Sequence, residues 1–178
     1  MNYANIKFND IANGEGIRTS LFVSGCTHQC KHCFNREAWD FNYGKVFDEA
    51  IQDKILASLA PSHINGLTLL GGEPMEPANQ KGLLPFVKRV KEVYPNKTIW
   101  CYTGYLFDKE LLSPSRAQCP WTRELLSYID VLVDGEFVYE LKDITLRFKG
   151  SSNQRVIDVQ QSLSAGQVIL SPYNEKKN

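Results

Sequence analysis

The sequence predicts an α/β fold, in which an open, curved and mostly parallel sheet of about five or six strands carries helices on its outside, as part of a (β/α) barrel. Short apolar, β-branched runs alternate with segments whose apolar residues repeat at helical spacing, a pattern typical of crossovers between parallel strands. The chain has 178 residues, whereas a closed barrel of this kind needs about 250. The sheet is therefore expected to stay open.

The first half of the chain supplies two strands and a helix. Residues 17–23, IRTSLFV, form a predicted strand that leads directly into a cysteine-rich loop. Apolar residues at helical spacing predict a helix over residues 47–60, with the acidic Asp48 and Glu49 in its first turn. Residues 66–70, GLTLL, form the next predicted strand, and the sequence GGEP follows it.

The second half continues the alternation of helices and strands. A helix is predicted over 83–94, a strand over 98–102, a short helix over 122–129 and a strand over 130–137. Two further runs, RVIDV at 155–159 and QVIL at 167–170, are candidate strands with no room for a helix of normal length between them.

Length and composition set further limits. With 43% apolar residues the chain can build one core, and we expect a single domain over residues 1–171 followed by a frayed tail at 172–178. Twenty basic residues balance twenty acidic ones, which argues against nucleic acid or an anionic membrane as a partner. The sequence shows no export signal and no stretch apolar enough to span a membrane, so we expect a cytoplasmic protein.

Polar or glycine-rich loops follow the four predicted strands. They are the cysteine loop after residue 23 and the loops at 71–74, 103–105 and 134–135. Because the carboxyl ends of parallel strands meet at one edge of a sheet, we expect these loops to form one ligand-binding face.

Three cysteines, Cys26, Cys30 and Cys33, lie within eight residues of the first loop. A structural zinc site needs four ligands, and with His28 or His32 as the fourth they would all come from one tight loop. An iron–sulfur cubane suits the spacing better, because a short loop can present one thiolate to each of three irons. The fourth iron then stays open to a small chelating ligand, which indicates catalysis.

The segment CTHQCKHC at 26–33, followed by GGEP at 71–74, resembles the radical S-adenosylmethionine superfamily. The resemblance implies the radical SAM core fold. It also implies that the three cysteines hold a [4Fe-4S] cluster whose free iron binds the amino and carboxylate groups of S-adenosylmethionine.

The same resemblance implies roles for single residues. His32, before the third cysteine, and Phe34, after it, are candidates for contact with the nucleoside, although His32 departs from the Tyr or Phe often seen at its position. The GGEP loop resembles the segment that meets the methionine amino group, where glycines permit close main-chain approach. The candidate cofactor-binding residues are therefore His32, Cys33, Phe34, Gly71, Gly72, Glu73 and Pro74.

No catalytic residue is expected beyond the cluster and S-adenosylmethionine. Further candidates for ligand or partner contacts are Tyr102, Thr103, Asp134, Asn153 and Arg155. For each of these, ordinary loop hydrogen bonding is an equal alternative.

Three segments, NGEGIRTSLFVSGCTHQCKHCFN, LTLLGGEP and GSSNQR, together resemble the family that activates anaerobic ribonucleoside-triphosphate reductase. The resemblance implies reductive cleavage of S-adenosylmethionine and formation of a glycyl radical on the glycyl-radical subunit of that reductase, with a flavodoxin-like electron donor. Two alternatives stay open. One is an activator of another glycyl-radical enzyme, of the formate-lyase type, and the other is a non-catalytic zinc module.

Overall fold

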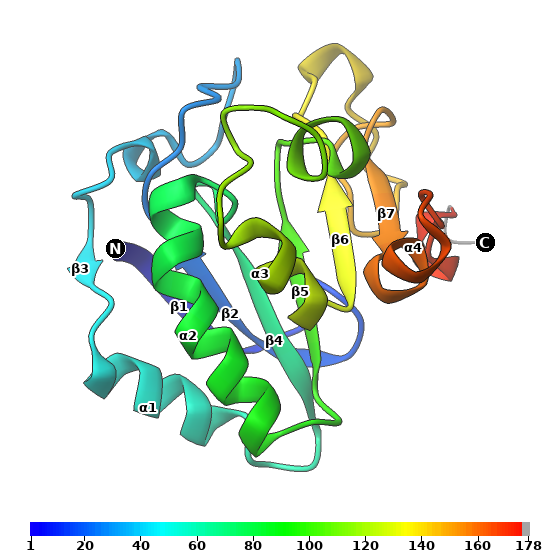
Figure 1. The fold of residues 1–178 in the computed structure, drawn as a ribbon. Coiled ribbons are helices and arrows are strands. Elements are labelled where there is room, and N and C mark those ends of the chain that lie inside the picture. The colour runs from blue at the N-terminus through cyan, green and yellow to red at the C-terminus, as the bar shows by residue number, and fades with distance from the viewer. Residues whose placement is uncertain (176–178) are drawn as a thin grey trace.

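The sheet that organises the molecule has seven strands in the order β3-β1-β2-β4-β5-β6-β7 (Figure 1). The computed structural model describes residues 1–175. Its strands are β1 (Asn2–Asp10), β2 (Ile17–Val23), β3 (Lys45–Val46), β4 (Ile64–Gly71), β5 (Thr98–Tyr102), β6 (Val131–Asp134) and β7 (Arg155–Asp158). Its helices are α1 (Glu49–Ser58), α2 (Pro77–Val93), α3 (Thr122–Tyr128) and α4 (Val159–Ala165), with 3-10 turns at Arg36–Trp39, Tyr139–Leu141 and Pro172–Asn174 and a π-helical turn at Phe107–Leu111.

The middle of the sheet is parallel and its margins are antiparallel. Strands β2, β4, β5 and β6 run in one direction. At one margin β1 pairs antiparallel with both β2 and β3, and at the other β7 pairs antiparallel with β6. The α/β class and the open sheet are confirmed, whereas the sheet has more strands than expected and is parallel only in its middle.

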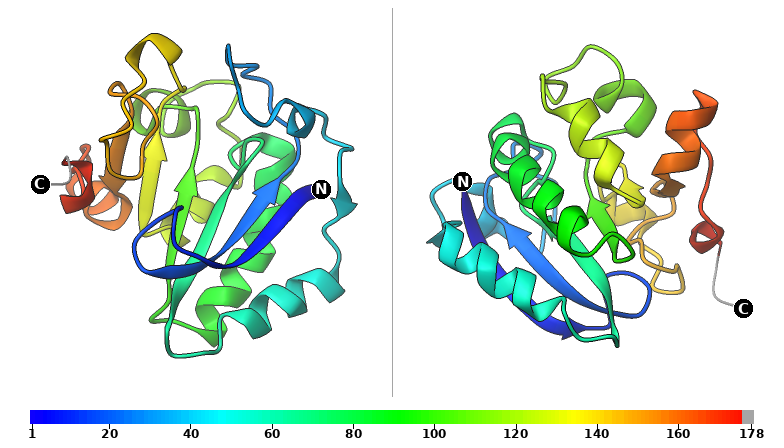
Figure 2. Two further views of the ribbon diagram at one scale, coloured as in Figure 1. Left: turned by 180° about the vertical axis from the view of Figure 1, so that it is seen from behind. Right: turned by 60° about the horizontal axis from the view of Figure 1, so that its bottom comes forward.

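Helices α1, α2 and α3 cover one face of the sheet, and loops cross the other face (Figure 1 and Figure 2). The main apolar core lies between the sheet and these helices, where Leu69, Phe86 and Leu132 have no exposed surface. The Asp48 carboxylate accepts a hydrogen bond from the Ile51 amide and so caps the start of α1. No helix within residues 1–175 is both long and apolar enough to cross a membrane.

Several elements differ from the expectation, among them the unpredicted two-residue strand β3 and strand β6, which ends at Asp134 and not at residue 137. Strand β1 was not predicted, because most of its residues are exposed or only partly buried and give no clear alternation. Helix α2 begins at Pro77, well before the predicted start at residue 83. The run RVIDV forms β7 and the first residue of the short α4, whereas QVIL contributes only an isolated bridge between Ile157 and Leu170.

A smaller apolar cluster forms around Trp100 on the face of the sheet opposite the helices. Successive residues of a strand point to opposite faces, so Cys101 is buried in the main core while Tyr102 packs beside Trp100. Tyr173, in the predicted C-terminal tail, packs against Trp100 with ring centroids 5.3 Å apart. Residues 176–178 of that tail lie outside the described residues.

Candidate functional site

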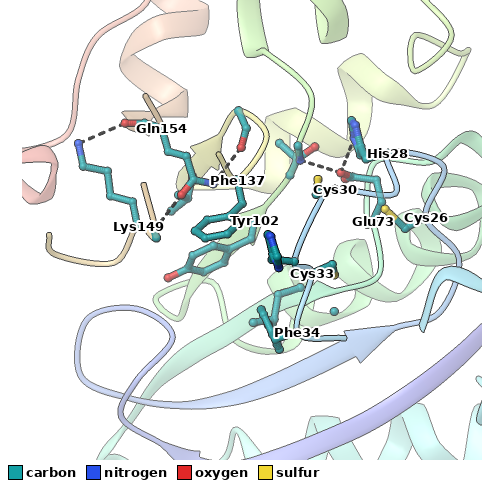
Figure 3. Close-up of a pocket in the computed structure, with 18 of the residues that line it drawn as sticks. Cys26, His28, Cys30, Cys33, Phe34, Glu73, Tyr102, Phe137, Lys149 and Gln154 are labelled. Atoms are coloured by element: carbon teal, nitrogen blue, oxygen red, sulfur yellow. Dashed lines mark hydrogen bonds and ion pairs between the residues drawn. The ribbon is translucent and has the colours of Figure 1, made fainter. Parts of the chain in front are cut away.

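A pocket of about 490 Å³ opens at the carboxyl edge of the parallel strands. Its walls come mainly from the loops after β2, β4 and β5 and from the long connection that follows β6 and leads to β7. In Figure 3 the three motif cysteines, His28 and Glu73 lie on one side of the pocket, and Lys149 and Gln154 lie on the other. The expectation that these loops meet on one face is therefore confirmed.

The cysteine loop, residues 24–35, leaves β2 through a series of tight turns. Gly25, Gln29 and His32 have positive φ angles of 96°, 53° and 60°. The Cys33 amide donates a hydrogen bond to the Cys30 carbonyl at 3.1 Å. These turns bring all three motif thiols to the pocket, where each is free and partly exposed.

The thiols suit an iron–sulfur cluster. Burial raises the pKa of Cys26 to about 12 and also raises the pKa of Cys30, so cluster binding must displace thiol protons. Among residues 1–175, no group of three or more His, Cys, Asp or Glu side chains is placed to hold a metal ion together. A [4Fe-4S] cubane needs no such convergence, because each thiolate binds a different iron. Three soft donors on one pocket wall fit that group.

His28, between the first two cysteines, contacts three neighbouring loops. Its side chain is 3% exposed, with Nε2 3.1 Å from Glu73 Oε2 and Nδ1 2.6 Å from Glu136 Oε1. Its ring packs against Tyr105 with centroids 4.2 Å apart. Burial alone lowers the pKa of His28, but hydrogen bonds and charge from Glu73 and Glu136 raise it overall. The cysteine loop is thereby tied to the loops after β4, β5 and β6.

Two buried side chains near the start of α2 hold the backbone of the same loop. The Glu76 carboxylate accepts hydrogen bonds from the Thr27 amide at 2.9 Å and from its hydroxyl at 2.5 Å. The Asn79 side-chain amide donates to the carbonyl oxygens of Ser24 and Glu73, each at 2.9 Å. Because Glu76 and Asn79 are almost fully buried, water competes little for these bonds.

The glycine pair after β4 is required by the packing of the protein itself. Gly71 has a φ of 112°, and a Cβ there would lie 2.7 Å from backbone atoms of Phe22. A Cβ on Gly72 would lie 2.6 Å from the Gly25 carbonyl oxygen and 2.8 Å from that of Ala38. The sequence predicts close approach of a ligand at these glycines, and in the structure β2 and the cysteine-loop region also approach them closely.

Most of the predicted site residues line the pocket. They are Cys26, Cys30, His32, Cys33, Phe34, Gly71, Gly72, Glu73, Tyr102 and Thr103. Pro74 is buried next to Glu73 in the chain and is not part of the lining.

Three other candidates are engaged in hydrogen bonds within the fold. Asp134 has no exposed surface and accepts a hydrogen bond from Arg155 Nε at 2.9 Å, and Arg155 also donates to Asp108 at 2.7 Å. The Asn153 side chain donates to the Glu136 carbonyl at 2.8 Å. Asp134, Asn153 and Arg155 are absent from the described lining, so the alternative of ordinary loop hydrogen bonding describes these contacts.

Several lining residues were not identified from the sequence, namely Asn13, Phe137, Tyr139, Lys142, Ile144 and Lys149. All but Asn13 belong to the connection between β6 and β7, which has no periodic pattern to place it. The sequence indicates His28 only as a candidate zinc ligand. Its position between two closely spaced cysteines was a signal that it belongs to the site.

Comparison with known proteins places the chain in a family. The model of the 4Fe-4S single cluster domain family matches residues 12–157. Over 156 residues, the chain is 47% identical to the anaerobic ribonucleoside-triphosphate reductase-activating protein of Haemophilus influenzae, covering 86% of this chain and 96% of that protein.

Two further relatives carry the same name. The Escherichia coli K12 protein is 42% identical over 158 residues, covering 88% of this chain and 97% of its own length. The protein of Enterobacteria phage T4 is 39% identical over 158 residues, covering 88% of this chain and 93% of its own length. The chain therefore belongs to the 4Fe-4S single cluster domain family and, within it, to the family of anaerobic ribonucleoside-triphosphate reductase-activating proteins.

Proposed function

We propose that this chain is an activating enzyme that uses a [4Fe-4S] cluster and S-adenosylmethionine to generate a glycyl radical on anaerobic ribonucleoside-triphosphate reductase. The observation that carries the proposal is the meeting of three free thiols and the glycine–glycine–glutamate loop in one pocket. The names of relatives that match most of the chain favour this reductase over a partner of the formate-lyase type, and favour a redox enzyme over a zinc module.

The fold is proposed to be the partial barrel of radical SAM proteins. Four parallel strands with helices on one face, and a pocket at the carboxyl edge of those strands, support this proposal. The antiparallel strands at both margins extend the sheet without adding further parallel strands.

Cys26, Cys30 and Cys33 are proposed to hold the cluster. When bound, the reduced cluster and S-adenosylmethionine supply a radical that takes a hydrogen atom from a glycine of the reductase. A flavodoxin-like protein is the proposed electron donor. The residues of this chain position these groups and keep water from them.

The proposed contacts with S-adenosylmethionine come from His32, Phe34, Gly71 and Gly72, with Tyr102 and Thr103 on the β5 side. The role of Glu73 is to position the loop. Its Oε1 accepts from the Met75 amide at 2.8 Å, and its Oε2 accepts from the Gly104 amide at 2.7 Å while also facing His28. Both carboxylate oxygens are thus engaged by the protein.

Residues away from the pocket are proposed to support its loops. Pro74 restricts the backbone between Glu73 and α2. Asp134 and Arg155 join the ends of β6 and β7, and Asn153 holds the Glu136 carbonyl, so that Glu136 stays in reach of His28.

The test is anaerobic reconstitution with iron and sulfide, followed by electron paramagnetic resonance of the reduced protein with and without S-adenosylmethionine. We expect a [4Fe-4S] signal that changes when S-adenosylmethionine is added and is lost in Cys26→Ala, Cys30→Ala and Cys33→Ala. Cys119→Ala is the matched control, since Cys119 is also free and partly exposed but does not line the pocket. Uptake of zinc without such a signal would overturn the proposal, as would the absence of a glycyl radical on the reductase.

A further inference from the structure

Exposed apolar side chains lie at the mouth of the pocket and in the 3-10 turn beside it. Phe34 and Ile144 are 90% and 89% exposed, the two highest values among the large apolar residues that the structure describes. Tyr139 is 49% exposed and Leu141 is 44% exposed. We call these four residues the apolar rim. Leaving such surface in water forgoes about 25 cal/mol for each Å² that could be buried, so its concentration at one place indicates a contact surface.

The rim is formed by two segments that extend beyond the strands. Phe34 belongs to the cysteine loop, and the other three residues belong to the connection between β6 and β7 (Figure 1). Phe34, Tyr139 and Ile144 all line the pocket, and Leu141 completes the 3-10 turn that begins at Tyr139. The rim is therefore continuous with the site that holds the proposed cofactors.

Direct contacts join the two segments beside the rim. The rings of His32 and Tyr139 lie with centroids 4.4 Å apart, and Lys31 Nζ lies 3.7 Å from Glu140 Oε1. Both members of this ion pair are largely exposed. An apolar centre edged by exposed charges of both signs is the usual composition of a protein–protein interface.

The chemistry of the site limits what can occupy this surface. Transfer of a hydrogen atom requires the reacting carbon to come into contact with the bound cofactor, so the partner must enter through the mouth of the pocket. The mouth is open to solvent, and three exposed apolar side chains, Phe34, Tyr139 and Ile144, line it. A main-chain loop with a glycine at its tip and apolar side chains on either side fits both features.

We propose that the apolar rim is the docking surface for the glycine-bearing loop of the reductase, whose flanking apolar side chains pack against Ile144 and Leu141. This inference rests on the proposed function and adds the surface through which the partner is recognised. The rim residues give affinity for the loop, and the pocket beyond them admits only its glycine.

The experiment compares three serine variants in the reconstituted enzyme: Ile144→Ser, Leu141→Ser and the control Val93→Ser. Val93 is 49% exposed at the end of α2, away from the carboxyl edge of the sheet. The measurements are the reductase concentration that gives half-maximal glycyl-radical formation, and the affinity for S-adenosylmethionine by anaerobic equilibrium dialysis.

We expect the half-maximal reductase concentration to rise at least about fivefold in Ile144→Ser and Leu141→Ser and to stay unchanged in Val93→Ser. The affinity for S-adenosylmethionine should remain that of the wild type. Docking at the rim is refuted if the wild type activates the reductase and both rim variants reach half-maximal activation at the same reductase concentration as the wild type. It is equally refuted if weaker S-adenosylmethionine binding accounts for the whole effect, or if size-exclusion chromatography shows that the variants differ from the wild type only in self-association. If the wild type forms no glycyl radical, the proposed function itself fails.

Discussion

His28 has the most connected side chain in the cysteine loop, and its loss should weaken the fold before any cluster is bound. Its ring nitrogens face two carboxylates, one of them on Glu73, which is 1% exposed. We expect His28→Gln to lower the free energy of unfolding by about 2 kcal/mol, less than the ~3–5 kcal/mol of a fully broken buried pair, because Glu73 keeps two backbone donors.

The measurement is urea denaturation of the reduced, cluster-free protein, which separates support of the loop from binding of the cluster. His63→Gln is the control, since His63 is exposed in the turn before β4. That control should change the unfolding free energy by less than about 0.5 kcal/mol. Equal urea midpoints of unfolding for His28→Gln and His63→Gln would contradict the role assigned to His28.

Gly72 offers a second residue-level test of how closely two loops approach. A Cβ at this position meets two backbone carbonyl oxygens, which cannot move away as a flexible side chain can. We expect Gly72→Ala to displace the cysteine loop, to cost about 2 kcal/mol of stability and to lower the iron and sulfide content after reconstitution by about half.

Gly82→Ala is the matched control for Gly72→Ala. An added Cβ on Gly82 meets only the flexible side chain of Met1, at 2.7 Å. Because Gly82 lies within α2, the change should be neutral or should stabilise the protein by up to about 1 kcal/mol. Normal iron content in Gly72→Ala would show that the approach of the two loops is not needed for assembly.

Among the secondary-structure elements, those with strong local signals were predictable. Strand β2 has the predicted bounds, because its run of buried, largely apolar residues has no competing pattern. Helix α1 starts close to its prediction because Asp48 caps it. Strand β1 gave no such signal, since antiparallel pairing at a sheet margin leaves its side chains partly in water.

The predicted helix starts only after Gly82, a residue type that usually weakens helices, whereas α2 begins at Pro77. It runs through Gly82 and Pro85, and burial of residues such as Leu83 and Phe86 outweighs their unfavourable propensity. Tertiary packing, which no local pattern reports, decided where this helix begins.

Pro85 should therefore destabilise α2, and replacing it should stabilise the protein. A proline inside a helix lacks the N–H that would bond to the carbonyl four residues earlier. Pro85 is exposed, so Pro85→Ala should raise the free energy of unfolding by about 1 kcal/mol, after allowing for the greater freedom of the unfolded chain.

Thermal or urea unfolding of the wild type and of Pro85→Ala would measure this increase in the free energy of unfolding. Pro77→Ala provides the comparison, because Pro77 occupies the first turn of the same helix, where no intrahelical bond is lost. If Pro85→Ala and Pro77→Ala raise the free energy of unfolding by similar amounts, the hydrogen bond missing at Pro85 is not the cause of the increase.

For the molecule as a whole, parallel topology explains which parts of the site were predictable. Loops that follow parallel strands must share an edge, so the cysteines and the glycine loop were expected to meet. The wall formed by Phe137, Tyr139 and Lys149 comes from a long, irregular connection whose path depends on contacts distant in sequence. The same applies to the partners of His28, which lie 45 and 108 residues away.

The balanced charge of the whole chain makes a further prediction about association with the reductase. Twenty basic and twenty acidic residues leave no net charge, and the pair beside the apolar rim joins Lys31 to Glu140. Long-range steering should therefore be weak, and apolar contact at the rim should supply most of the affinity.

Raising the salt concentration from about 0.05 M to about 0.5 M should accordingly change the half-maximal reductase concentration by less than about threefold, even though the Debye length falls severalfold. Sodium sulfate at the same ionic strength should strengthen association slightly, because it favours burial of apolar surface. The measurement is the rate of glycyl-radical formation at several reductase concentrations in each salt. A tenfold weakening in sodium chloride would instead mean that charged groups outside the rim dominate docking, since apolar contacts are not screened by salt.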